Sequence, residues 1–148
     1  MYKRQEASDS FGCQCIVLAI DAYKDQSNFK SGYNVSTHGG KKKTDIDALE
    51  WAIEGEKNGA GEILLTSMNA DGTKLGYDIE LTSKISKEVS IPVIASGGAG
   101  KPIDMVNVLN KGNASAVLAA SIFHFGIYSI ENVKKEMLRY KLPVRNKW

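Results

Sequence analysis

The segment IPVIASGGAGKP, residues 91–102, decides the fold class of this chain. It begins with a continuous apolar run, passes through the glycine-rich turn Gly97–Gly100 and ends on Pro102, a residue that favours the first turn of a helix. A run that is apolar at every position, rather than at alternate positions, is typical of a parallel strand buried on both faces. The segment therefore predicts a strand, a tight turn and a crossover helix in succession.

The same unit recurs along the chain. Further apolar runs occupy residues 15–20, 62–66 and 116–120. Apolar residues at helical spacing predict helices over residues 45–58, 78–89, 102–110 and 129–140. We expect Thr44 to cap the first of these helices and Gly59 to end it. Four strand–helix units with no linker between them predict one α/β domain over residues 1–148, built on a parallel sheet.

Composition narrows the class of protein. The chain has 148 residues, 43% of them hydrophobic and 24% charged, which fits a single globular domain. A formal net charge of only +2 gives no support to a nucleic-acid partner. No apolar stretch approaches the roughly 18 residues that a membrane span requires, and the basic start turns acidic at Glu6 and Asp9, unlike a signal peptide. These features predict a cytoplasmic protein without a membrane partner.

The two cysteines, Cys13 and Cys15, stand two residues apart at the expected entry to the first strand. A disulfide between them would be strained, and no other cysteine or histidine pair has the spacing of a zinc site. We therefore expect both to be reduced packing residues, and we expect no metal site.

The loop over residues 22–43 is the longest connection in the chain. Its segment Tyr33–Thr37 lies between Gly32 and the pair Gly39-Gly40. Glycines at both ends of a short polar and β-branched segment indicate a small hairpin, which we expect to lie over the functional site.

The glycine-rich turn Gly97–Lys101 invites comparison with nucleotide-binding loops. It fails the P-loop test, because Ala95 stands at the first glycine position and Pro102 follows the lysine in place of serine or threonine. Two interpretations remain open: the free N–H groups of the turn hold a phosphate, or the tight turn merely requires glycine.

The end of the fourth apolar run carries the small residues Ala120 and Ser121. In many (β/α)8 enzymes the loops after the seventh and eighth strands bind a substrate phosphate, and small residues let the backbone approach it. His124 follows between Phe123 and Phe125 and is expected to be a packed histidine rather than a catalyst.

Asp21 is the best acid–base candidate, because a carboxylate at the mouth of an apolar strand is partly desolvated. The competing interpretation is a helix cap or a loop salt bridge with Lys24. Asp71-Gly72-Thr73, after the second apolar run, is either a turn or a grip on a ligand.

Several segments together resemble the cyclase subunit of imidazole glycerol phosphate synthase, a (β/α)8-barrel family. The matching segments occur in the family's order and are AIDA (19–22), THGGKK (37–42), GAGEILLTS (59–67), DGTK (71–74), GYD (76–78), IASGGAG (94–100) and AASIFH (119–124). The resemblance covers residues 6–145 and implies the C-terminal (β/α)4 half of a TIM barrel. Residues 1–5 match nothing in the family and are expected to be a non-native leader.

The resemblance also implies a reaction. In this family, ammonia from a glutaminase partner converts phosphoribulosyl-formimino-aminoimidazole-carboxamide ribotide to imidazole glycerol phosphate and aminoimidazole carboxamide ribotide, a lyase step of histidine biosynthesis. Asp21 matches one of two catalytic aspartates, and the strand with the other is absent from this chain. Positions that match the family's phosphate- and substrate-binding residues are Thr66, Asp71, Gly72, Ser96, Gly97, Gly98, Ala120 and Ser121. Glu62 matches a charged gate for ammonia, and no cofactor is implied.

Some positions depart from the commonest family pattern. Met68-Asn69-Ala70 more often reads Ile-Asp-Arg, and Tyr23 stands where lysine is frequent. These departures leave open a paralogue that aminates a surface-polysaccharide sugar, or a phosphate-binding half-barrel without catalysis. The isomerase that precedes the cyclase in the pathway shares the half-barrel design but fits less well. We expect the chain alone to be inactive, and to self-associate or to pair with an N-terminal half through the inward faces of its strands, for example Val17, Leu64, Val93 and Leu118.

Overall fold

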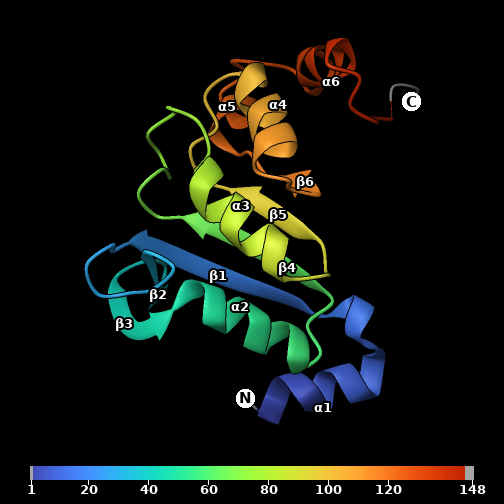
Figure 1. Ribbon diagram of the computed structural model, residues 1–148. Coiled ribbons are helices and arrows are strands. Elements are labelled where there is room, and N and C mark those ends of the chain that lie inside the picture. The colour runs from blue at the N-terminus through green and yellow to red at the C-terminus, as the bar shows by residue number, and fades with distance from the viewer. Residues whose placement is uncertain (1, 146–148) are drawn as a thin grey trace.

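The computed structural model describes residues 2–145, and its centre is one six-stranded sheet (Figure 1). The strands are β1 (Val17–Lys24), β2 (Tyr33–Thr37), β3 (Lys42–Asp47), β4 (Glu62–Ser67), β5 (Val93–Ser96) and β6 (Ala116–Val117), in the order β3-β2-β1-β4-β5-β6. β1, β4, β5 and β6 are parallel, whereas β2 and β3 form an antiparallel hairpin beside β1. The four parallel strands with their helices confirm the half-barrel prediction.

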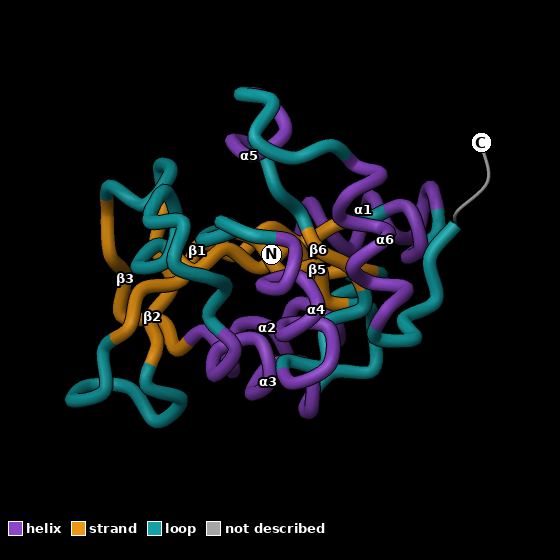
Figure 2. The backbone as a smooth tube through the Cα atoms, turned by 90° about the horizontal axis from the view of Figure 1, so that it is seen from above, coloured by secondary structure: helices purple, strands orange, loops and turns teal. Residues whose placement is uncertain are grey.

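Helices precede, connect and follow the parallel strands. They are α1 (Tyr2–Phe11), the 3₁₀ turn η1 (Cys13–Cys15), α2 (Ala48–Lys57), α3 (Ile79–Glu88), α4 (Pro102–Lys111), α5 (Ser121–His124) and α6 (Ile130–Arg139). α2, α3 and α4 are the connecting ones, and they lie on the same side of the sheet (Figure 2). Among the described residues, no helix is long and apolar enough to span a bilayer.

The core lies between the sheet and the crossover helices. Along β1, the side chains of Leu18, Ile20 and Ala22 are buried, while Val17 is 51% exposed. The same alternation runs through β4 and β5, because only one face of the sheet is covered. The prediction that these strands are buried on both faces is therefore wrong for this chain, although continuous apolar runs are what a closed barrel requires.

This alternation also corrects the expected set of inward residues. Val93 is 1% exposed and points to the helices, so it belongs to the core. Val17 and Leu118 are 51% and 42% exposed and lie on the uncovered side. Leu64 is half-buried, between the buried Ile63 and Leu65. Three of the four named residues thus line the open face.

The hairpin changes the start of the first crossover helix. Residues 42–47 form β3, so Thr44 is a strand residue whose hydroxyl donates to the Val35 carbonyl at 2.7 Å, and the prediction that it caps the helix is wrong. Asp47 caps α2 instead, because its carboxylate accepts from the N–H groups of Leu49 and Glu50. The predicted end is confirmed: Asn58 is the C-cap and Gly59 follows with φ of 89°.

The two ends of the parallel set also differ from expectation. Cys13 and Cys15 lie on the turn η1 before β1 and are exposed, so they are not packing residues. At the other end, the edge strand β6 consists of Ala116 and Val117 only. Its pairing with β5 stops after Val117. The Leu118 N–H still donates to the Ala95 carbonyl at 2.9 Å, which keeps the following segment beside β5.

The predicted hairpin is confirmed, but it continues the sheet. β2 pairs with Asp21–Lys24, the upper half of β1. Within the described residues, Val17–Ile20 pair with β4 alone, so the outer edge of this first half of β1 is open.

Candidate functional site

Three of the predicted site residues form a row at the carboxyl ends of the parallel strands. In the strand register Asp21 is opposite Thr66, and Thr66 is opposite Ser96. Each is half-buried, and its neighbours along the strand are buried toward the helices, so all three side chains face the uncovered side of the sheet. One carboxylate and two hydroxyls thus meet on the face that a full barrel would enclose.

The competing interpretations of Asp21 do not fit this geometry. Asp21 lies inside β1 and therefore caps no helix. Lys24 pairs with Glu80 at 3.0 Å instead of with Asp21. The hydroxyl of Ser36 donates to the main-chain carbonyl of Asp21 at 3.0 Å, and this bond does not use the carboxylate.

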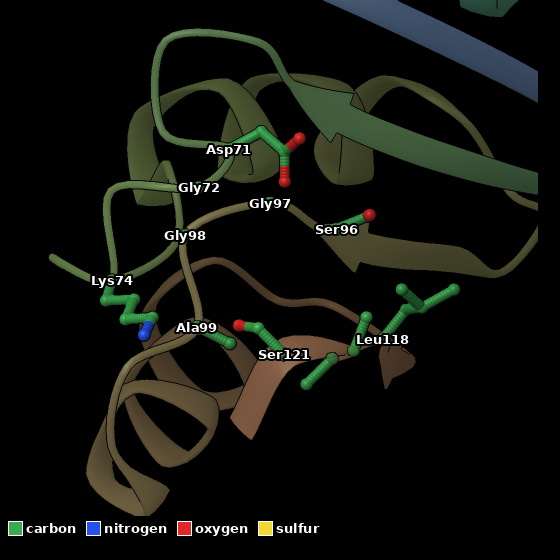
Figure 3. A pocket seen from close by; sticks show the side chains of 11 residues that line it. Asp71, Gly72, Lys74, Ser96, Gly97, Gly98, Ala99, Leu118 and Ser121 are labelled. Atoms are coloured by element: carbon green, nitrogen blue, oxygen red, sulfur yellow. The ribbon is translucent and has the colours of Figure 1, made fainter. Parts of the chain in front are cut away.

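A pocket of about 150 Å³ lies beside this row (Figure 3). It brings together seven of the eight positions that the resemblance matched to phosphate or substrate binding, and its lining residues are Asp71, Gly72, Lys74, Ser96, Gly97, Gly98, Ala99, Leu118, Ala119, Ala120 and Ser121. Thr66, in the row, is not among the lining residues.

Backbone packing shapes the floor of the pocket. Gly97 and Gly98 have φ of 88° and 100°, which residues with a side chain rarely adopt. A Cβ on Gly97 would lie 2.8 Å from the Ser67 carbonyl oxygen, and one on Gly98 would overlap the Gly76 carbonyl. The Gly76 N–H donates to the Gly98 carbonyl at 2.8 Å. Glycine is therefore required here for close approach of two loops, and the same packing presents the turn to the pocket.

Only part of the glycine-rich turn is available to a ligand. The N–H groups of Gly100 and Lys101 donate to the Asp104 carboxylate at 3.0 and 2.8 Å. The prediction that the whole turn offers free N–H groups is therefore wrong at these two positions, because Asp104 caps the start of α4 with them. Gly97, Gly98 and Ala99 are the part of the turn that lines the pocket.

Lys74 is the cation that sequence reasoning missed. It lines the pocket, and its side chain extends toward the glycine turn (Figure 3). Its φ of 59° belongs to the tight turn that follows Asp71-Gly72-Thr73. The signal in the sequence is its place in the segment DGTK, directly after the candidate ligand grip Asp71-Gly72-Thr73.

Tyr77 fixes the position of Leu118, which lines the pocket. Its hydroxyl donates to the Leu118 carbonyl at 2.9 Å, which ties the loop after β4 to the end of β6. Burial, with a smaller contribution from the charge of Asp104, raises the pKa of Tyr77 well above its ordinary value, so the hydroxyl stays a donor.

Comparison with known proteins adds a family to this geometry. The family model described as "Histidine biosynthesis protein" matches residues 3–129. The chain belongs to this family. Its relatives include proteins named imidazole glycerol phosphate synthase subunit HisF. That of Dehalococcoides mccartyi is 56% identical over 138 residues, 93% of this chain and 53% of the relative. That of Corynebacterium diphtheriae is 54% identical over 145 residues, 96% of this chain and 56% of the relative.

A third relative of the same name, from Caulobacter vibrioides, is 53% identical over 138 residues, which is 93% of this chain and 52% of that protein. The chain thus spans about half the length of the curated relatives that it matches.

Two further predicted positions of this histidine biosynthesis family member lie outside the pocket. Glu62 begins β4, four residues before Thr66, and so stands about 13 Å away at the opposite end of the strand. His124 is exposed and touches the ring of Phe125, itself 68% exposed, so the expectation of a packed histidine is wrong. The described residues contain no group of three or more histidine, cysteine or acidic side chains that could hold a metal.

Proposed function

We propose that this chain is the carboxyl-terminal half of the cyclase subunit of imidazole glycerol phosphate synthase, a lyase of histidine biosynthesis in the cytoplasm. The observation that carries the proposal is the row of Asp21, Thr66 and Ser96 beside a pocket made of glycines, Ser121 and Lys74. The names of the relatives favour the histidine pathway over a paralogue that aminates a sugar.

The pocket holds one terminal phosphate of the ribotide in this proposal. The first N–H groups of a helix have no partner within it, and those at the start of α5 follow Ala120 at the pocket wall. Lys74 supplies the positive charge that a phosphate requires. Asp71 carries a carboxylate, which accepts hydrogen bonds from substrate hydroxyls and disfavours direct contact with phosphate oxygens.

Asp21 acts as one of the two proton-transfer groups. General acid–base catalysis needs a donor and an acceptor on different sides of the substrate, and each contributes typically 10²–10⁴-fold. The second aspartate, and the grip on the other phosphate, belong to an amino-terminal half. The chain alone is therefore proposed to bind phosphate without closing the imidazole ring at a useful rate.

Two partners complete the proposed enzyme. The uncovered face of the sheet, with Val17 and Leu118 exposed, is the surface for an amino-terminal half-barrel or, in its absence, a second copy of this chain. A glutaminase subunit supplies ammonia at the end of the barrel where Glu62 stands, opposite Asp21. Glu62 is proposed to gate the entry of ammonia.

The deciding experiment combines this chain with the amino-terminal half of the Dehalococcoides mccartyi relative and measures turnover of the ribotide with ammonium ions. We expect turnover only when both halves are present. In the combined barrel, Asp21→Asn should lower kcat by at least about 10²-fold. A near-normal rate for Asp21→Asn, or substantial turnover by this chain alone, would contradict the proposal.

A phosphate titration of this chain, followed by backbone NMR, separates binding from catalysis. Shifts should concentrate at Gly97, Gly98 and Ser121, and Lys74→Gln should weaken them. Binding without turnover in the combined barrel would favour a phosphate-binding half-barrel that lacks the chemistry. Shifts confined to other loops would contradict the assignment of the pocket.

A further inference from the structure

The tip of the hairpin between β2 and β3 touches the segment that follows β4. Of residues 37–43, all of which the structure describes, Gly40 alone is not exposed. A Cβ on Gly40 would overlap the terminal methyl of Met68 and would lie 3.4 Å from the Tyr23 hydroxyl. Its neighbour Gly39 has nothing within 4 Å of the equivalent position. At the apex of the tip, therefore, Gly40 and not Gly39 makes the contact.

Both residues beneath the tip belong to the open face of the sheet. Tyr23 stands two residues beyond Asp21 in β1, and Met68 stands two residues beyond Thr66, so each follows a site residue on the same face. The Met68 N–H donates to the Ala22 carbonyl at 2.9 Å, which keeps the segment after β4 alongside β1. The contact with Gly40 therefore bridges the carboxyl ends of two neighbouring strands.

Lys43, on the strand that returns from the tip, makes a second contact with Tyr23. The Lys43 ammonium lies 5.0 Å from the centre of the Tyr23 ring, within cation–π distance. Tyr23 thus contacts the tip near its apex through the hydroxyl and along its returning strand through the ring.

We propose that Tyr23 and Met68 are positioning residues that hold the tip, His38–Lys43, across the carboxyl end of β1 as a fixed wall of the substrate cleft beside Asp21. This inference rests on the proposed cyclase function. Pairing with Asp21–Lys24 alone would leave the far end of the hairpin free to swing. Contact at the tip removes that freedom before the substrate arrives, and a preformed wall lowers the cost of ordering the bound complex.

Amide hydrogen exchange on this chain tests the docking without any substrate. In Gly40→Ala, exchange at residues 37–43 should be about tenfold faster than in the control Gly39→Ala, because local opening requires less free energy. Gly39 and Gly40 both have positive φ, 63° and 82° respectively, so alanine causes comparable backbone strain at either position. Met68→Ala should also speed exchange, and Gly40→Ala added to it should cause little further change. Equal exchange in the two glycine variants, or strictly additive effects, would overturn the docking.

Kinetics of the combined barrel test the wall. Met68→Ala should raise the KM for the ribotide about fivefold and leave kcat within about twofold, because the wall shapes binding and does not transfer protons. Met68→Leu, which keeps the bulk, should restore KM. An unchanged KM despite faster exchange would overturn the role of the tip in the cleft. A wild-type barrel without turnover would instead count against the cyclase function, and the exchange comparison would still decide the docking.

Discussion

The glycine turn and the hairpin both lie at the carboxyl ends of the parallel strands, but different interactions hold them in place. Around the pocket beside the glycine turn, backbone packs on backbone: Gly97 against the Ser67 carbonyl, Gly98 against Gly76, with a hydrogen bond of 2.8 Å between the latter two. This kind of packing depends on the absence of a Cβ and hardly at all on charge.

The hairpin pairs with β1 through its backbone, and side chains from α3 and its N-cap also hold the start of β2 and the residues around it. The Tyr33 and Ser67 hydroxyls donate to the Asp78 carboxylate at 3.1 and 3.2 Å. Lys84 donates to the Ser31 carbonyl at 2.8 Å, and Glu80 pairs with both Lys24 and Lys84.

This difference teaches where each region is vulnerable. The glycine turn is disrupted when a methyl group is added at Gly97 or Gly98, whatever the pH or salt concentration. A hairpin anchored by hydroxyls, carboxylates and ammonium groups weakens when charge or hydrogen-bonding capacity is removed.

The largest expected effect is at Gly98. Gly98→Ala forces a Cβ into the Gly76 carbonyl at a φ of 100°, so the free energy of unfolding should fall by about 3 kcal/mol or more. Gly72→Ala is the matched control, because Gly72 also lines the pocket with positive φ but has nothing within 4 Å. The control should cost about 1 kcal/mol. Urea unfolding of both variants measures the difference, and similar losses would mean that the close approach is not what requires glycine.

An intermediate effect is expected at Asp78. Asp78→Ala removes the N-cap of α3 and leaves the partly buried hydroxyls of Tyr33 and Ser67 without their acceptor, which should cost about 2–3 kcal/mol. Ser129→Ala removes an exposed cap from α6 and should cost only about 1 kcal/mol. Thermal unfolding compares the two. If both caps cost the same, Asp78 does no more than cap its helix.

The smallest expected effect is a dependence on pH at Glu80. Hydrogen bonds and charge from Lys84 and then Lys24 lower the pKa of Glu80 from its ordinary 4.5 to about 2. A lowered folded-state pKa gives stability that is present above about pH 4.5 and is lost as the pH falls toward 2. Because Glu80 is largely exposed, the contribution should stay below about 1 kcal/mol.

Glu80→Gln should therefore lower stability at pH 7 slightly and flatten the fall between pH 4.5 and 2. Unfolding curves at several pH values, in low salt and in 1 M salt, measure it. A pH dependence that is the same in the variant, or that high salt leaves unchanged, would contradict the ion-pair account.

The sequence alone predicted the succession of parallel strands and crossover helices and most of the positions that the structure brings together at the pocket. Apolar runs and the glycines that follow them identified β4, β5 and the pocket turn, because burial and close backbone approach leave a local mark on residue type. Asp21 could be selected because a carboxylate at the end of an apolar strand is unusual in itself. The family resemblance then assigned roles to positions such as Ala120 that carry no chemical signal of their own.

Tertiary structure alone decided which side chains meet. The helical pattern of apolar positions predicted over residues 45–58 begins at Ile46, but pairing with β2 makes residues 42–47 a strand and moves the cap from Thr44 to Asp47. Whether an N–H group is free depends on a neighbour such as Asp104, and whether a strand is buried on one face or two depends on what covers it. The contact of Met68 with Gly40 joins residues 28 positions apart. Local sequence cannot specify such a contact, because it arises only when two loops are brought to the same edge of the sheet.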